Sequence, residues 1–310
     1  MTTVRNRAAG WHRPLMLLVS AMAVLTVVAA VGVVADPRVL TGAPIWAKPM
    51  KFAISFVLYG VTLAWMLSLL PRRSRAAERA ATVIVAMSVV EMVVIVVQVL
   101  RGTASHFNGT TALNAALFDV MGVAIMVLFA AQFVLAVVLA RRPLPDRAGG
   151  YAVRLGLAVS LLGMVVAFPM VAQTPAGSPT GISGAHSVGV PDGGPGLPLL
   201  GWSTTGGDLR VGHFVGMHAL QALPLLAILL DRFLGRRLDE LTRARLVLVG
   251  GAAYAGLTLL VTAQALRGQP LLAPDALTLA AAGMLVAATA AATALVLARR
   301  GRRTEVVLVR

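Results

Sequence analysis

Eight long blocks of apolar residues run through this chain and limit the folds open to it. The blocks cover residues 14–35, 51–70, 80–100, 115–140, 152–173, 211–231, 246–266 and 276–298. A bilayer core about 30 Å thick needs about 20 apolar residues per helix, which each block supplies. Only 13% of the residues are charged, whereas soluble domains contain about 25%. The sequence therefore predicts an all-α, polytopic membrane helical bundle of about eight transmembrane helices.

The basic residues predict an orientation for this bundle. When the spans alternate across the membrane, 21 of the 27 arginines and lysines fall on one side. Cytoplasmic loops carry such an excess, so we expect both the N- and C-termini to be cytoplasmic. There are only two lysines, an arginine bias that is typical of GC-rich bacterial genomes. We therefore expect a multi-pass protein of a bacterial cytoplasmic (inner) membrane, whose first partner is the lipid bilayer.

The net charge of +15 does not indicate a nucleic-acid partner, because the basic residues form short clusters between the apolar blocks. The chain contains no cysteine, which excludes disulfides, thiolate metal sites and cysteine nucleophiles. It also contains no nucleotide-binding, zinc-protease or serine-hydrolase signature, so an ATPase or hydrolase is not expected.

A short sequence recurs at the outer ends of two spans. Residues 98–102 read Gln-Val-Leu-Arg-Gly, and residues 264–268 read Gln-Ala-Leu-Arg-Gly, four spans later. This spacing predicts two parallel four-helix repeats, residues 1–150 and 151–310, related by an axis along the membrane normal.

The second predicted repeat contains an external loop, residues 174–210, that is rich in glycine and proline. Such a composition favours turns over regular structure. The sequence leaves two interpretations open: a flexible external loop, or a lid over an external pocket.

Ionisable residues inside apolar blocks are the main candidates for function, because they are costly in hydrocarbon. Glu91 lies near the middle of the third block, and Gln98 and Arg101 follow on the same helical face. Together they predict a polar stripe about 15 Å long that reaches the outer surface. Glu91 is either a carboxyl that handles protons or cations, or a structural carboxyl hydrogen-bonded between helices.

The sixth span carries a second polar group. It contains His213, His218 and Gln221, and Pro224 is expected to kink this helix. His218 could act as a ligand, as a proton carrier or as a packed, hydrogen-bonded histidine.

Further polar residues are predicted at the same outer end. The turn after the third span holds His106 and Asn108, and Asp119 enters the next span. Both lysines, Lys48 and Lys51, belong to the first external segment and could bind an anion, pair with Asp119 or Glu91, or snorkel at the interface. The candidate binding residues are Lys48, Lys51, Glu91, Gln98, Arg101, His106, Asn108, Asp119, His213, His218, Gln221, Gln264 and Arg267.

Three functions remain open at this point. The first is a transporter or permease for a small polar or anionic solute, with possible proton coupling through Glu91. The second is a membrane redox protein that binds haem or quinone, with His218 and His106 as candidate haem ligands. The third is a non-catalytic membrane subunit, in which Glu91 and His218 would support assembly alone.

Three segments carry a family resemblance: residues 46–52, with Trp-x-Lys-Pro-x-Lys-Phe, residues 101–108, with Arg-Gly-x-x-Ser-His-Phe-Asn, and residues 207–214, with Gly-Asp-Leu-Arg-x-x-His-Phe. In these segments the chain resembles a group of uncharacterised multi-pass bacterial membrane proteins, which brings no assigned activity. The layout of two four-helix units also resembles haem A synthase, in architecture only. That family places paired histidines on helices of both halves, and spans two, four and eight of this chain contain none.

Overall fold

The computed structural model describes residues 11–144, 146–174, 177 and 180–308. Within these residues, eight helical spans are long and apolar enough to cross a membrane. The helices are α2 (Arg13–Ala35), α3 (Ala47–Ser68), α4 (Arg75–Leu100), α5 (Ala112–Ala140), α6 (Arg147–Val165) with its short continuation α7 (Pro169–Ala172), α8 (Leu209–Leu234), α9 (Glu240–Leu266) and α10 (Ala276–Leu308). The predicted all-α bundle is confirmed. Both chain ends, including Arg5, Arg7 and Arg310, lie outside the described residues.

Several helices begin before their apolar blocks because a side chain caps the first turn. Ser74 accepts a hydrogen bond from a backbone N–H of α4, Thr111 does so for α5, and Asp239 does so for α9. The helix α3 begins at Ala47, which places Lys48 and Lys51 in its first two turns. The sequence analysis had assigned both lysines to an external segment.

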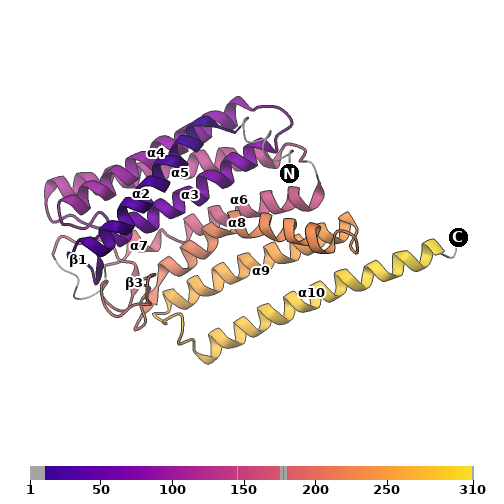
Figure 1. The fold of residues 1–310 in the computed structure, drawn as a ribbon. Coiled ribbons are helices and arrows are strands. Elements are labelled where there is room, and N and C mark those ends of the chain that lie inside the picture. Colours follow the sequence, from indigo (N-terminus) through magenta and orange to yellow (C-terminus); the bar gives the residue numbers. More distant parts are fainter. Residues whose placement is uncertain (1–10, 145, 175–176, 178–179, 309–310) are drawn as a thin grey trace.

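The axes of the spans lie roughly parallel to one another, the chain direction alternates from span to span, and α10 lies at the edge of the bundle (Figure 1). The helix α2 packs on α3, α4 packs on α5, α6 packs on α8 and α9, and α9 packs on α10. The first four spans meet the last four where α5 contacts α6 and α3 contacts α8.

The connecting segments gather at two ends of the bundle. Segments 69–74, 141–144 and 235–239 contain arginine pairs and form what we call the arginine-rich end. Segments 36–46, 101–111, 173–174, 180–208 and 267–275 form the arginine-poor end. Two small antiparallel sheets lie at the arginine-poor end. In one, β1 (Val39–Leu40) pairs with β2 (Ala43–Pro44), and in the other β3 (Ser187–Val188) pairs with β4 (Gly207–Asp208), with Ser187 opposite Asp208.

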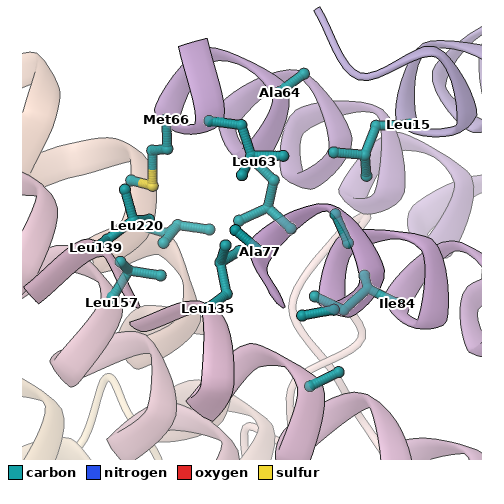
Figure 2. Close-up of a cluster of buried hydrophobic side chains, with 14 of the residues drawn as sticks. Leu15, Leu63, Ala64, Met66, Ala77, Ile84, Leu135, Leu139, Leu157 and Leu220 are labelled. Carbon is teal, nitrogen blue, oxygen red and sulfur yellow. The ribbon is translucent and has the colours of Figure 1, made fainter. Parts of the chain in front are cut away.

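The largest buried apolar cluster fills the arginine-rich half of the bundle and joins both halves of the chain (Figure 2). Its central side chains come from α3, α5, α6 and α8, and we call them the apolar layer: Leu63, Met66, Leu135, Leu157 and Leu220. Each of them is at most 1% exposed. The bundle is therefore closed by hydrocarbon side chains at this depth.

The two halves differ in how closely their first two spans approach. In the second half, a Cβ added at Gly163 of α6 would lie 2.4 Å from the backbone N of Met217 in α8. In the first half, a Cβ added at Gly60 of α3 would meet a side-chain methyl of Val19 in α2 at 2.7 Å. At Gly163, the backbones of α6 and α8 are in contact with each other. At Gly60, the backbone of α3 is in contact with a side chain of α2.

Candidate functional site

The two recurring pentapeptides form the same structure at the ends of α4 and α9. Gly102 and Gly268 have backbone φ angles of 72° and 73°, the left-handed conformation that ends many helices. In both cases the backbone N–H after the glycine donates to the carbonyl of the glutamine, Gln98 or Gln264. The glutamine Nε2 then donates to the carbonyl six residues on, at 3.2 Å in the first copy and 2.7 Å in the second. The glutamines therefore hold the turns that leave these helices.

The arginine of each pentapeptide contacts the start of the next helix. Arg101 Nη1 donates to Asn114 Oδ1 in the first turn of α5 at 2.8 Å. Arg267 pairs with Asp275, which caps α10, and donates to Thr278 at 3.3 Å. The predicted polar stripe from Glu91 through Gln98 to Arg101 is therefore not one unit. Gln98 and Arg101 form hydrogen bonds that stabilise the end of α4, and Glu91 does not take part in them.

Residues 180–208, which we call the cap, fold across the arginine-poor end. The Ser183 N–H donates to the Phe107 carbonyl at 3.0 Å, and the Gly109 N–H donates to the Gly181 carbonyl at 2.6 Å. On the opposite side, Lys51 Nζ donates to the Leu200 carbonyl at 3.2 Å. The cap is thus hydrogen-bonded to α3 and to the α4–α5 turn, as a lid would be.

Seven ionisable side chains collect beneath and within the cap, and we call them the polar cluster. They come from α3, α4, the α4–α5 turn, the cap and α8: Lys48, Glu91, His106, His186, Asp192, Arg210 and His213. Lys48 interacts electrostatically with Glu91, Arg210 and Asp192, and His106 interacts with Lys48, His186 and His213. The cluster therefore joins both halves of the chain.

Each histidine of the polar cluster is oriented through its Nδ1 atom. His186 Nδ1 lies 2.6 Å from Asp192 Oδ2, His213 Nδ1 donates to the Gly163 carbonyl at 2.8 Å, and His106 Nδ1 lies 3.1 Å from Ser105 Oγ. Among the described residues, none of the three Nε2 atoms has a hydrogen-bond partner. None of these atoms is fully buried. In His186 and His213 the free Nε2 lone pair can accept a hydrogen bond or bind a metal.

Two histidines of the polar cluster, His106 and His186, lie outside the spans, and the pKa of each is lowered. Burial lowers the pKa of His106 well below its ordinary value, and Lys48 and the neighbouring imidazoles lower it further. Burial also lowers the pKa of His186, and the opposing hydrogen bond to Asp192 does not cancel the effect. Burial would raise the pKa of Asp192, but donors from His186 and from the Ser187 backbone bring it below its usual range.

Lys48 and Glu91 face each other without a direct contact. Lys48 Nζ lies 5.9 Å from the centre of the Phe52 ring. Within the described part of the chain, neither side chain takes part in a hydrogen bond or an ion pair, although each acts electrostatically on the other. Glu91 is only 4% exposed. Ionisable residues inside a membrane bundle are costly and often mark the path of a solute or an ion.

Aromatic rings enclose His106. Phe52 lies 5.9 Å and Phe118 lies 6.3 Å from it between ring centres, and Phe107 stacks edge-on against His186 at 4.9 Å. Phe107 also has a backbone φ of 58°, which is rare for a residue with a Cβ atom. Such conformations persist where the surroundings hold them, often at functional sites.

Two hydrogen-bonded chains join helices of the bundle next to the apolar layer. Tyr59 Oη donates to Gln132 Oε1 at 2.6 Å, and Gln132 Nε2 donates to Ser160 Oγ at 3.1 Å. Gln221 Nε2 donates to Thr62 Oγ1 at 3.2 Å. Both chains connect the two halves of the bundle.

In the described chain, no hydrogen bond joins the remaining predicted residues to the polar cluster, although His218 acts electrostatically on His213. His218 Nδ1 lies 3.3 Å from Gln221 Oε1 in the second of these chains. Asn108 forms bonds within its own turn, to Thr103, Ala104 and Thr110. Asp119 is exposed, and no hydrogen bond or ion pair joins it to Lys48 in the described residues.

His186, Asp192, Arg210 and Phe107 are not among the residues predicted from the sequence. The first two lie in a segment without periodicity, where spacing says nothing about neighbours. The one available signal is an acid and an imidazole in a segment otherwise poor in ionisable residues. Among the described residues, no group of three or more histidine, aspartate or glutamate side chains could hold a metal ion.

Comparisons with protein-family models, with curated proteins and with solved structures gave no match. The resemblance to haem A synthase therefore stays a prediction.

Proposed function

We propose that this integral membrane protein is a carrier that binds a small solute in the polar cluster and moves it together with a proton. The observation that supports this proposal is the pair formed by Lys48 and Glu91. Their charges lie on different helices and act on each other, and neither side chain takes part in a hydrogen bond or an ion pair among the described residues. A bound solute with an acidic group would complete the environment of Lys48, and Glu91 would carry the proton.

The histidine lone pairs narrow the chemistry of the solute. The Nε2 atoms of His186 and His213 offer lone pairs, which accept hydrogen bonds from donor groups. The best match is a small molecule with one acidic group and at least one hydroxyl or ammonium donor. Hydroxy acids and amino acids have this combination.

The arrangement of the two halves supports alternating access. The polar cluster lies at the arginine-poor end, and the apolar layer closes the bundle on the other side of it. In carriers built from repeats, one half rocks against the other around a site between them. We propose that the two halves of this chain are such repeats and that the arginine-poor end faces outward from a bacterial cytoplasmic membrane.

The test uses purified full-length protein in liposomes that contain a pH-sensitive dye. Small hydroxy acids, amino acids and simple carboxylates are added outside one at a time. We expect at least one hydroxy acid or amino acid to acidify the liposome interior with the wild type. We expect Glu91→Gln to abolish this proton movement and Lys48→Met to abolish solute uptake.

Asp119→Asn is the matched control, because it removes a carboxylate from the same end of the bundle at an exposed position. It should leave transport unchanged. The proposal fails if no acid of the panel produces a flux, or if Asp119→Asn and Glu91→Gln reduce the flux equally.

One observation favours a second candidate, a haem-binding redox protein. Three imidazoles with free Nε2 atoms lie near phenylalanine rings, and imidazole Nε2 is a common axial ligand of haem iron. The geometry favours His106, His186 and His213 for this role over His218. A Soret band in purified protein that weakens in His213→Ala would support haem, and a featureless spectrum would exclude it.

A further inference from the structure

A cavity of about 840 Å³ lies at the arginine-rich end, between the starts of α2 and α4. Its lining includes Trp11, His12, Arg13, Arg73, Glu78 and Arg79. It lies at the opposite end of the bundle from the polar cluster and plays no part in the proposed transport.

The lining of this cavity is positively charged. Three arginines face a single carboxylate, that of Glu78. Glu78 is itself 3.7 Å from His12 Nε2. His12 adds no charge at neutral pH because burial lowers its pKa, and its Nδ1 accepts a hydrogen bond from the Leu15 N–H.

Two of the arginines have donors to spare. Arg13 and Arg79 are exposed, and neither has a hydrogen bond or ion pair within the described residues. A third donor is the indole Nε1–H of Trp11, which is buried and has no acceptor in the described chain. Guanidinium groups match the oxygen geometry of phosphate well.

The place of the cavity in the fold points to the source of such a phosphate. It opens at the ends of two membrane spans, at the depth of lipid headgroups, where basic pockets between helices select anionic lipids. Apolar side chains continue from it along the spans: Val83 of α4 lines the cavity, and Leu17 of α2 is 72% exposed. Acyl chains would lie against these surfaces.

We propose that this cavity binds the phosphate headgroup of an anionic phospholipid, held by Arg13 and Arg79. The test is native mass spectrometry of the full-length protein in neutral detergent, titrated with phosphatidylglycerol, phosphatidylcholine or inorganic phosphate. We expect phosphatidylglycerol to be retained, and the other two to bind much more weakly. The double variant Arg13→Gln/Arg79→Gln should weaken the retained binding about fivefold for each arginine removed.

The matched control is Arg141→Gln/Arg236→Gln, which removes two exposed arginines from the same end but outside the cavity. It should retain the lipid as the wild type does. An equal loss in both double variants would overturn the proposal, because the attraction would then follow the overall charge. Equal binding of phosphatidylcholine would overturn the selection for anionic lipid, and equal binding of inorganic phosphate would overturn the lipid as the source. Unfolding midpoints in neutral detergent check that the variants are folded.

Discussion

The ends of α4 and α9 are built alike, but the segments that follow them differ in chemistry. Both helices end in a glutamine, an arginine that reaches the next helix and a left-handed glycine. The turn after α4 then brings His106 and Phe107 beneath the cap, whereas the turn after α9 contains no imidazole. The two helix ends therefore share one geometry, but only the turn after α4 carries residues of the polar cluster.

The largest difference between the halves is expected where their first two helices pack. Gly163→Ala forces a methyl group against the backbone of α8, which cannot rotate away. We expect it to lower the free energy of unfolding by about 1–3 kcal/mol. Gly60→Ala, which meets only the Val19 side chain, should cost clearly less. Unfolding in detergent, followed by circular dichroism, measures both; equal costs would mean that α6 and α8 separate more easily than their contact suggests.

Acid should loosen the cap before it loosens the turn after α9. The folded cap keeps His106 and His186 neutral because burial lowers the pKa of each, whereas an opened cap lets them protonate near the ordinary histidine value of about 6.5. Stability from these groups is therefore complete above about pH 6.5 and is lost as the pH falls toward the folded-state pKa. The lysine and arginine of the cluster, Lys48 and Arg210, oppose protonation throughout this range.

Hydrogen exchange checks this expectation after correction for the intrinsic effect of pH. Between about pH 7.5 and about pH 5.5, residues 102–111 and 180–208 should lose protection while residues 268–275 keep theirs. The variant His186→Gln should reduce the pH dependence in the cap. If both turns lost protection together, the histidines would not be its cause.

The smallest expected effect concerns the two glycines themselves. A Cβ at Gly102 or Gly268 would have room, since the nearest atoms are 3.8 Å and 3.7 Å away. The cost of Gly102→Ala and of Gly268→Ala is then only that of a left-handed alanine, about 1 kcal/mol each. Equal unfolding costs would support a shared scaffold, and a difference above about twofold would argue against it.

Hydropathy predicted the eight spans because a bilayer sets the length of each apolar block. It placed the starts of α4, α5 and α9 too late because capped first turns are polar. It also placed the start of α3 too late, although Trp46 makes no side-chain cap there, which left Lys48 outside the predicted block and Lys51 at its edge. A rule that reads Ser74 or Thr111 as an N-cap would have corrected the starts of α4 and α5.

The candidate site was predictable only in part. Glu91 and His213 stood out because ionisable residues are rare in apolar spans, and His106 because it follows a recurring helix end. Their neighbours could not be predicted, since the cap brings His186 and Asp192 to them by folding across the bundle. Arg101 and Arg267 were predicted to bind a ligand because arginines are rare at this end of the bundle. In the structure, each of them instead donates a hydrogen bond to the first turn of the next helix.

The position of α10 has a consequence for how the chain is made. None of the most apolar window of α10 is buried, and this helix packs mainly on α9. It also leaves the ribosome after the seven other spans of the described chain. The contacts among those seven spans are therefore available before α10 emerges, and its docking on α9 is a separate, later step of membrane insertion.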